Sequence, residues 1–193
     1  IVPRTGEIEK DIVKNLGIED LAPVSHEDFR QWVIEDKFCK GRPPWEKVGV
    51  QFSENVHGYE DQKIRILNGG HQILANAAEL LNIETVRDAM KNKMIVSLLE
   101  KIEKDEIIPH IKPVPGYTPL EYYELIASRF SNPSIQDTTR RVAFDGSSRH
   151  AGFLVPSIKD GIKHNISIIG LSLAEALWAR MCEGTREDGS IIE

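Results

Sequence analysis

Three side chains capable of acid–base or hydrogen-bonding chemistry lie close together in the sequence: Lys63, Asn68 and His71. On a helical wheel that advances 100° per residue, Lys63 and His71 fall on the side that carries the apolar residues of this segment. We expect a lysine there to be partly desolvated, which lowers its pKa and suits it to act as a base near neutral pH. The same wheel predicts a solvent face made of Asp61, Arg65, Gln72, Asn76 and Glu79.

A structural interpretation of the same residues stays open. Lys63 can extend its ammonium group to the surface, and His71 can be a core histidine with satisfied hydrogen bonds. On spacing alone this is the simpler interpretation. Gly69 and Gly70 follow Asn68, and two glycines inside a helix cost roughly 1 kcal/mol each relative to alanine. They indicate a close approach, either of a ligand or of a neighbouring helix.

Arg141 and Arg149 are further candidates for contact with a ligand. Asp137 precedes Arg141 by four residues, which is the spacing of an ordinary ion pair on a helix surface. Arg149 follows Asp145-Gly146 in a predicted loop, where it can simply be solvated. From these patterns alone, both arginines are interpreted as structural.

The spacing of apolar residues predicts a mainly α protein that forms one domain over residues 1–193. Thr118-Pro119 followed by Glu121 is typical of a helix start. The run 166–169 is the only hint of a strand, and the stretch 36–50 is rich in turn residues. Helices are predicted at 59–81, 83–107 (ending before Pro109), from 119 onward, 134–144 (stopping at Asp145-Gly146), 156–163 and 172–183.

Composition narrows the classes of function. The chain has 24 Lys and Arg against 30 Asp and Glu, a net charge of -6 and a pI of about 5.6, which argues against a nucleic-acid partner. Its uncharged runs are shorter than the ~20 apolar residues that span a bilayer, and the first residues do not resemble a signal peptide. Two cysteines fit a reducing cytoplasm. Neither G-x-G-x-x-G nor G-x-x-x-x-G-K-[ST] occurs, so no nucleotide-binding loop is predicted.

The segment Lys63-Ile-Arg-Ile-Leu-Asn68-Gly-Gly-His71 resembles the K-x-x-x-x-N-x-x-H signature of the polyol-specific long-chain dehydrogenases, the mannitol dehydrogenase family. The resemblance implies an N-terminal Rossmann-type domain and a multi-helical C-terminal substrate domain, of which this chain resembles only the second. Ile1-Val2-Pro3 is similar to the end of the family's V-D-R-I-[TV]-P segment, so we expect the Rossmann domain to precede it. Further blocks similar to the family lie at 29–38, 41–52, 129–133, 145–149 and 178–184.

The resemblance also implies a role for each residue of the motif. Lys63 matches the catalytic lysine, which takes the proton from the reacting alcohol and returns it during ketone reduction. Asn68 matches an asparagine that stabilises the alkoxide-like oxygen. His71 matches a residue hydrogen-bonded to substrate, and Glu60 matches a carboxylate that gates proton exit from the lysine.

Arg141 and Arg149 match two cationic positions that hold substrate hydroxyls. Arg149 stands where mannitol-specific members have lysine, and the two side chains differ in reach and donor geometry, which leaves fine substrate preference open. The Asn68-Gly-Gly-His71 form also departs from the more usual Asn-Gly-Ser-His.

The resemblance therefore implies a cytoplasmic, NAD(P)-dependent oxidoreductase of carbohydrate metabolism that interconverts a polyol and a ketose, such as mannitol and fructose. No metal is expected, because His71 lacks the Cys or His partners of a zinc site. NAD or NADP would be bound mainly by the N-terminal Rossmann domain, the expected protein partner, so this domain alone is expected to be inactive. Two alternatives stay open: a fructuronate- or tagaturonate-type sugar-acid reductase, whose substrate carboxylate would suit Arg149, and a non-catalytic helical interaction domain.

Overall fold

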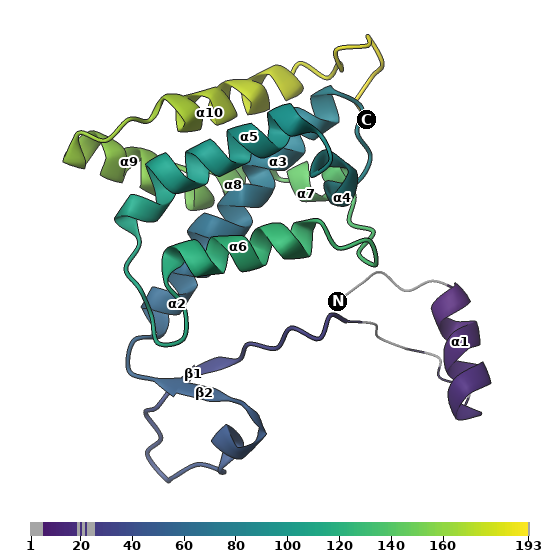
Figure 1. Ribbon diagram of the computed structural model, residues 1–193, viewed down its shortest axis with the longest axis vertical. Helices are drawn as coiled ribbons and strands as arrows, with labels where there is room; N and C mark the ends of the chain where they lie inside the picture. Colours follow the sequence, from purple (N-terminus) through teal and green to yellow (C-terminus); the bar gives the residue numbers. More distant parts are fainter. Residues whose placement is uncertain (1–5, 19, 21, 23–25, 193) are drawn as a thin grey trace.

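Helices make up most of the computed structural model, which confirms the mainly α prediction (Figure 1). The structure describes residues 6–18, 20, 22 and 26–192, so the family-like start at Ile1-Val2-Pro3 lies outside the described residues. The elements up to residue 80 are α1 (Gly6–Leu16), β1 (Val33–Glu35), the 3-10 helix η1 (Trp45–Val48), β2 (Gln51–Ser53), α2 (Val56–Gln62), the π-helix η2 (Lys63–Asn68) and α3 (Gly69–Leu80). Those that follow are α4 (Val86–Ala89), α5 (Lys93–Ile102), the π-helix η3 (Glu103–Ile107), the 3-10 helix η4 (Ile108–His110), α6 (Pro119–Phe130), α7 (Thr139–Ala143), α8 (Gly146–Phe153), α9 (Val155–His164) and α10 (Ile169–Met181).

The candidate motif lies on a continuous helical segment formed by α2, η2 and α3. Asn55 caps its start by accepting a hydrogen bond from the Gly58 N–H, so the helix begins three residues earlier than predicted. Its C-terminal half, α3, packs against α4, α5, α7, α8 and α10 and is therefore the central helix of the molecule (Figure 1). The prediction of one long helix over 59–81 is confirmed, although its middle has the wider π-helical hydrogen-bonding pattern.

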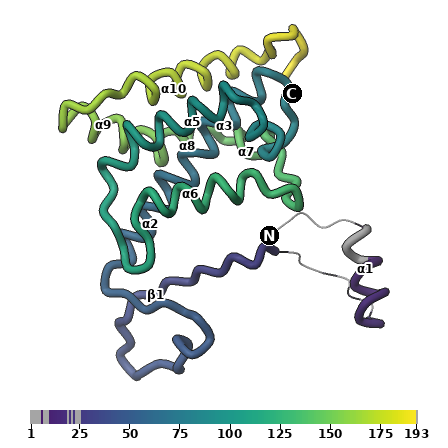
Figure 2. Tube along the Cα trace, in the orientation of Figure 1, coloured from purple at the N-terminus to yellow at the C-terminus, as the bar shows by residue number. Residues whose placement is uncertain are grey.

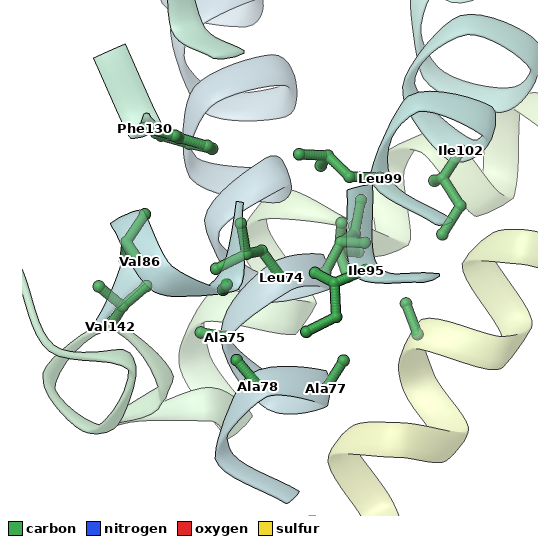
Figure 3. Close-up of a cluster of buried hydrophobic side chains, with 14 of the residues drawn as sticks. Leu74, Ala75, Ala77, Ala78, Val86, Ile95, Leu99, Ile102, Phe130 and Val142 are labelled. Atoms are coloured by element: carbon green, nitrogen blue, oxygen red, sulfur yellow. The ribbon is translucent and has the colours of Figure 1, made fainter. Parts of the chain in front are cut away.

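The hydrophobic core surrounds α3 (Figure 3). Leu74, Ala75 and Ala78 of this helix are fully buried, and Ile95, Leu99 and Ile102 reach them from α5. Val86 from α4, Phe130 from α6 and Val142 from α7 also belong to the labelled cluster. Because side chains from α4, α5, α6 and α7 meet on α3, its position is fixed on several sides.

The predicted solvent face of this helix is wrong. Arg65, Gln72, Asn76 and Glu79 are all buried, and only Asp61 is partly exposed. Each buried side chain has a polar partner distant in the sequence: Arg65 contacts Ser157 and Asp160, Gln72 donates to the Val142 carbonyl, Asn76 bonds His150, and Glu79 accepts from Arg186 and Thr139. Polar residues on a helix face solvent by default, but here the C-terminal third of the chain supplies the hydrogen bonds that allow their burial.

The single helix predicted at 83–107 is also wrong, because α4, α5 and η3 occupy that range, with a break between α4 and α5. Thr85 caps the short α4, and Asn92 caps α5 by accepting from the Met94 and Ile95 N–H groups. After α5 the chain continues as η3 and then as η4, which contains Pro109. Asparagine and threonine side chains compete with the helical backbone for hydrogen bonds, which explains the interruption.

The predicted helix 134–144 is shortened to α7, at Thr139–Ala143. Residues before it are extended because the backbone of Asp137 and Thr139 pairs with Val86 and Glu84. A new helix, α8, starts at Gly146, so Arg149 lies on a helix and not in the predicted loop. The chain reaches α8 through Asp145, which has a left-handed φ of 60°.

Two of the remaining helices follow the prediction closely. Thr118 and Glu121 form a complete capping box with Pro119 at the start of α6, and α9 covers the predicted range 156–163. The last helix, α10, overlaps the predicted range 172–183 but begins at Ile169 and ends at Met181. Figure 2 shows the chain reversing direction between α9 and α10, where Asn165 has a left-handed φ of 55°. None of the described helices is long and apolar enough to cross a bilayer.

The strand predicted at 166–169 is wrong, since Ile169 begins α10. The two described strands, β1 and β2, instead border the turn-rich stretch and pair in parallel, with Ile34 opposite Phe52. Trp32 precedes β1, stacks on Trp45 and remains 60% exposed.

Candidate active site

The π-helix η2 aligns Lys63 with Asn68. In an α-helix, residues five positions apart point about 140° away from each other, because each residue turns the helix by 100°. In a π-helix the hydrogen bonds run between residues five apart, so side chains at that spacing come toward the same side of the helix. The Gly69 N–H donates to the Ile64 carbonyl in this pattern. We call the continuous helical segment of α2, η2 and α3 (Val56–Leu80) the site helix. Lys63, Asn68 and, three residues later, His71 therefore point toward one side of the site helix.

Four of the predicted site residues line one cavity of about 280 Å³. Asn68 and His71 come from the site helix, Arg141 comes from α7, and Arg149 comes from α8. The rest of the wall is Leu67, Gln72, Val142 and Phe153. The fold thus brings together donors that are about 80 residues apart in the sequence, around a space lined by both polar and apolar groups.

His71 packs against an aromatic ring in the wall of this cavity. Its ring lies 4.3 Å from the Phe130 ring, and its Nδ1 atom is buried without a hydrogen-bond partner among the described residues. Burial lowers the pKa of His71 to about 4, although the nearby Asp137 carboxylate opposes that shift. His71 is therefore a neutral imidazole at physiological pH, able to exchange a hydrogen bond with an uncharged hydroxyl.

The two arginines are held in different ways. Asp137 binds Arg141 through two hydrogen bonds, one of them from Nε to Oδ1 at 2.6 Å, and this pair raises the pKa of Arg141. The spacing-based prediction of an Asp137–Arg141 ion pair is confirmed, and Arg141 nevertheless lines the cavity. Arg149 donates from Nη1 to the Val142 carbonyl at 2.5 Å.

Lys63 is exposed, so the predicted placement among apolar side chains is wrong. It lies at the first residue of η2, before the helix enters the bundle. Glu60, one turn earlier, is 61% exposed and its Oε2 lies 3.2 Å from His57 Nδ1. Glu60 also lines a second cavity, of about 580 Å³, together with Arg65 and His110.

The glycines of the motif make room for neighbouring protein. A Cβ atom at Gly69 would lie 3.2 Å from Leu154 Cδ2, and one at Gly70 would lie 3.0 Å from Glu103 Oε1. Of the two interpretations left open by the sequence, these contacts favour helix packing over ligand approach.

The family model of the mannitol dehydrogenase C-terminal domain matches residues 55–193, which include every residue of this site. The chain belongs to this family. The resemblance recognised in the Lys63–His71 motif is thereby confirmed. The match begins at Asn55, so the extension of the domain over the first 54 residues stays a prediction.

The similarity to individual relatives extends over the whole length of this chain. The chain is 49% identical over 193 residues to a mannitol 2-dehydrogenase of Cereibacter sphaeroides, covering 100% of this chain and 40% of that protein. It is 35% identical to a mannitol 2-dehydrogenase of Aspergillus oryzae, covering 100% of this chain and 39% of that protein. The chain therefore spans about 40% of the length of the curated relatives it matches.

Solved structures show the same fold. A substrate-free D-sorbitol dehydrogenase matches with a TM-score of 0.92 and 35% identity, over 100% of this chain and 40% of that one. Pseudomonas fluorescens mannitol 2-dehydrogenase, in a ternary complex with NAD and D-mannitol, matches with a TM-score of 0.87 and 37% identity, over 99% of this chain and 39% of that one. The multi-helical fold predicted from the resemblance is confirmed.

Sequence reasoning missed a buried polar network that fixes α8 against the site helix of this mannitol dehydrogenase C-terminal domain. His150 Nε2 lies 2.7 Å from Asn76 Nδ2, and its Nδ1 lies 3.0 Å from Glu175 Oε1. The His150 ring also stacks on Trp178 at 4.6 Å. His150 directly follows Arg149, so this network positions a residue of the cavity wall. Burial lowers the pKa of His150, while Glu175 opposes the shift.

Gln72 is a second residue that the sequence did not single out. It lines the cavity and donates from Nε2 to the Val142 carbonyl at 3.0 Å, the same oxygen that accepts from Arg149. The only sequence signal for it was its position one residue after His71. Among the described residues, no three His, Cys, Asp or Glu side chains are placed to hold a metal ion.

Proposed function

We propose that this chain is the substrate-binding part of an NAD(P)-dependent polyol dehydrogenase that interconverts a polyol and a ketose such as mannitol and fructose. The observation that carries the proposal is the cavity where Asn68, His71, Arg141 and Arg149 converge. Lys63 does not line this cavity but begins the π-helix that ends at Asn68. The neutral and cationic donors of the cavity suit an oxygen-rich ligand. The relatives' names and the NAD and D-mannitol complex support the same substrate class.

Lys63 is proposed as the general base for alcohol oxidation. In its neutral form its amine takes the hydroxyl proton of the substrate, and as an ammonium group it returns that proton when a ketone is reduced. NAD, when bound, supplies the acceptor for the hydride that leaves the carbinol carbon. Asn68 lies one π-helical turn away and is proposed to donate a hydrogen bond to the oxygen as negative charge develops on it.

The other site residues are proposed to bind the substrate or to move its proton. His71, Arg141 and Arg149 hold hydroxyl groups along the cavity wall. Glu60 is proposed to receive the proton from Lys63 and release it to solvent, which its own exposure permits. We propose a metal-independent reaction, because Lys63 and Asn68 supply the base and the charge stabilisation that a catalytic zinc otherwise provides.

The cofactor is proposed to be held mainly by an N-terminal Rossmann domain, the protein partner of this chain. The exposed position of Lys63 fits this arrangement, since it leaves the amine open to groups from outside the described residues. No residue of this chain is assigned to the cofactor, and NAD and NADP both remain candidates. We further propose that the chain is inactive by itself, and that the complete enzyme serves carbohydrate metabolism in the cytoplasm.

The proposal is tested with the full-length protein and a panel of polyols and sugar acids, each with NAD and NADP. We expect mannitol oxidation, and we expect Lys63→Ala to lower kcat by about 10² to 10⁴ while the circular dichroism spectrum is unchanged. Lys101→Ala is the matched control, because Lys101 is an exposed helical lysine that does not line the cavity and that pairs only with Asp105 among the described residues. Near-normal turnover in Lys63→Ala would exclude Lys63 as the base.

A further inference from the structure

Three arginines lie around His71, and they differ in whether a carboxylate is bound to the guanidinium group. Arg129 is paired with Glu27, with Nη2 and Oε2 2.7 Å apart, in a smaller cavity of about 160 Å³ that shares His71 with the first. Arg141 is paired with Asp137. Arg149 instead donates to a neutral partner, the Val142 carbonyl, so no carboxylate among the described residues offsets its charge.

Asp137 stands between the two cavities. It lines the smaller one, and its carboxylate holds Arg141, which lines the larger one. Its side chain is only 16% exposed, whereas Arg141 is 65% exposed. The backbone of Asp137 is fixed separately, because its carbonyl accepts from the Val86 N–H at 2.9 Å. The carboxylate is thus held near the site by contacts that do not involve a ligand.

The geometry of the pair limits what Arg141 can bind. Asp137 occupies the Nε–H and one Nη2–H of the guanidinium, and it cancels most of the charge that a ligand would meet there. The remaining N–H groups can each donate to a hydroxyl, which needs only one donor. A substrate carboxylate in the same place would lie near a second carboxylate, and the repulsion would offset its attraction to the guanidinium.

We propose that Asp137 makes the site selective for uncharged polyols and ketoses over sugar acids, an inference that rests on the proposed function. Asp137 acts here through Arg141 as a positioning residue. The imidazole of His71 is neutral, so it adds no positive charge that would compensate for the negative charge of Asp137. Arg149 remains as one cation on the cavity wall, but one of its N–H groups is committed to the backbone.

The first measurement uses the wild-type full-length enzyme. D-Mannonate, which differs from mannitol by a carboxylate at one end, is tested as an inhibitor of mannitol oxidation. We expect its inhibition constant to exceed the KM for mannitol by about tenfold or more, equivalent to at least 1.4 kcal/mol. If mannonate binds as tightly as mannitol, the proposal is overturned. If the enzyme does not oxidise any neutral polyol, the proposed function itself fails.

The second measurement removes the carboxylate charge. In Asp137→Asn we expect the ratio of the mannonate inhibition constant to the mannitol KM to fall by about tenfold or more, because no carboxylate then offsets the charge of Arg141. Asp137→Glu keeps the charge and should retain the wild-type ratio. Asp105→Asn removes a carboxylate from another i,i+4 pair, with Lys101, and should also leave the ratio unchanged.

An unchanged ratio in Asp137→Asn, in an enzyme that oxidises mannitol, overturns the inference and leaves the proposed function standing. If Asp137 had a merely structural role, its replacement would weaken the binding of both ligands alike and would also leave the ratio constant. If Asp137→Asn does not fold, Asp137→Ser is measured in its place, and the wild-type comparison decides if neither variant folds.

Discussion

Glu103 gives the sharpest test of how this fold tolerates a buried acid. Its side chain is completely buried in η3, and neither carboxyl oxygen has a hydrogen-bond partner among the described residues. Gly70 of the site helix lies against it, since a Cβ there would be 3.0 Å from Glu103 Oε1. Burial raises the pKa of Glu103 well above its ordinary value of 4.5, because an ionised carboxylate without a partner is poorly solvated there.

The effect on stability follows from the difference in the pKa of Glu103 between the folded and unfolded states. The unfolded chain releases the Glu103 proton above pH 4.5, whereas the folded chain retains it to a higher pH. Neutral pH lies 2.5 units above that value, and each unit is worth about 1.36 kcal/mol, so retaining the proton costs up to about 3.4 kcal/mol at pH 7. Below pH 4.5, Glu103 is protonated in both states and does not lower the free energy of unfolding. As the pH rises above 4.5, the unfolded state is favoured by losing the proton, so the free energy of unfolding falls.

Glu103→Gln replaces the acid by an amide of similar shape that does not titrate. We expect the variant to gain stability relative to wild type as the pH is raised, by about 2.5 kcal/mol between pH 5 and pH 7 if Glu103 stays protonated throughout. The assay is urea unfolding followed by circular dichroism at both pH values. At any one pH, the difference in the free energy of unfolding between variant and wild type also contains the cost of burying the amide. The change of this difference with pH is therefore the quantity to compare.

Glu100→Gln is the matched control. Glu100 lies three residues earlier and is half-exposed beside Lys104, so its replacement should give no comparable gain at pH 7. A stability difference between Glu103→Gln and wild type that does not change from pH 5 to pH 7 would refute the reasoning. It would mean that Glu103 ionises in the folded protein at its ordinary pKa.

Three further predictions concern stability and the cavity wall. Glu106→Ala should destabilise the protein by about 2–5 kcal/mol in urea unfolding. The buried Glu106 carboxylate accepts hydrogen bonds from the Gly170 and Leu171 N–H groups at 2.8 and 2.7 Å and so caps α10. A loss of less than about 1 kcal/mol would contradict this role. Gly146→Ala should cost about 1–3 kcal/mol by thermal unfolding, since its Cβ would lie 2.3 Å from Trp178 Nε1, whereas Gly152→Ala in the same helix meets nothing within 4 Å and should be neutral or stabilising. Gln72→Leu should raise the KM for mannitol more than it lowers kcat, because it frees the Val142 carbonyl that orients Arg149; a change confined to kcat would count against that role.

Local sequence features predicted much of the helical structure. Thr118, Pro119 and Glu121 are neighbours along the chain, and they form the predicted capping box because all its hydrogen bonds lie within four residues. The long central helix was likewise predictable from its apolar spacing. The family resemblance depended on side-chain types in a short segment and was confirmed over most of the chain.

The breaks between helices were harder to predict. Asn92 ends one helical stretch and caps the next, although the apolar spacing continues across it. Residues before α7 became extended because they pair with backbone near Val86, some fifty residues earlier in the chain. A pattern within one segment carries no information about such a partner, so the helix predicted there was too long.

What the sequence alone determined was the set of chemical groups: a lysine, an asparagine, a histidine and two arginines, in a family pattern. Only the tertiary structure decided their surroundings. Asn76 and Gln72 are buried and not on the solvent face because His150 and the Val142 carbonyl, about 70 residues away, supply their hydrogen bonds. Lys63 and Asn68 share one side because the packed helix takes the π form between them. Helix periodicity follows from neighbours along the chain, whereas the burial of a polar group depends on a distant partner that the fold alone brings near.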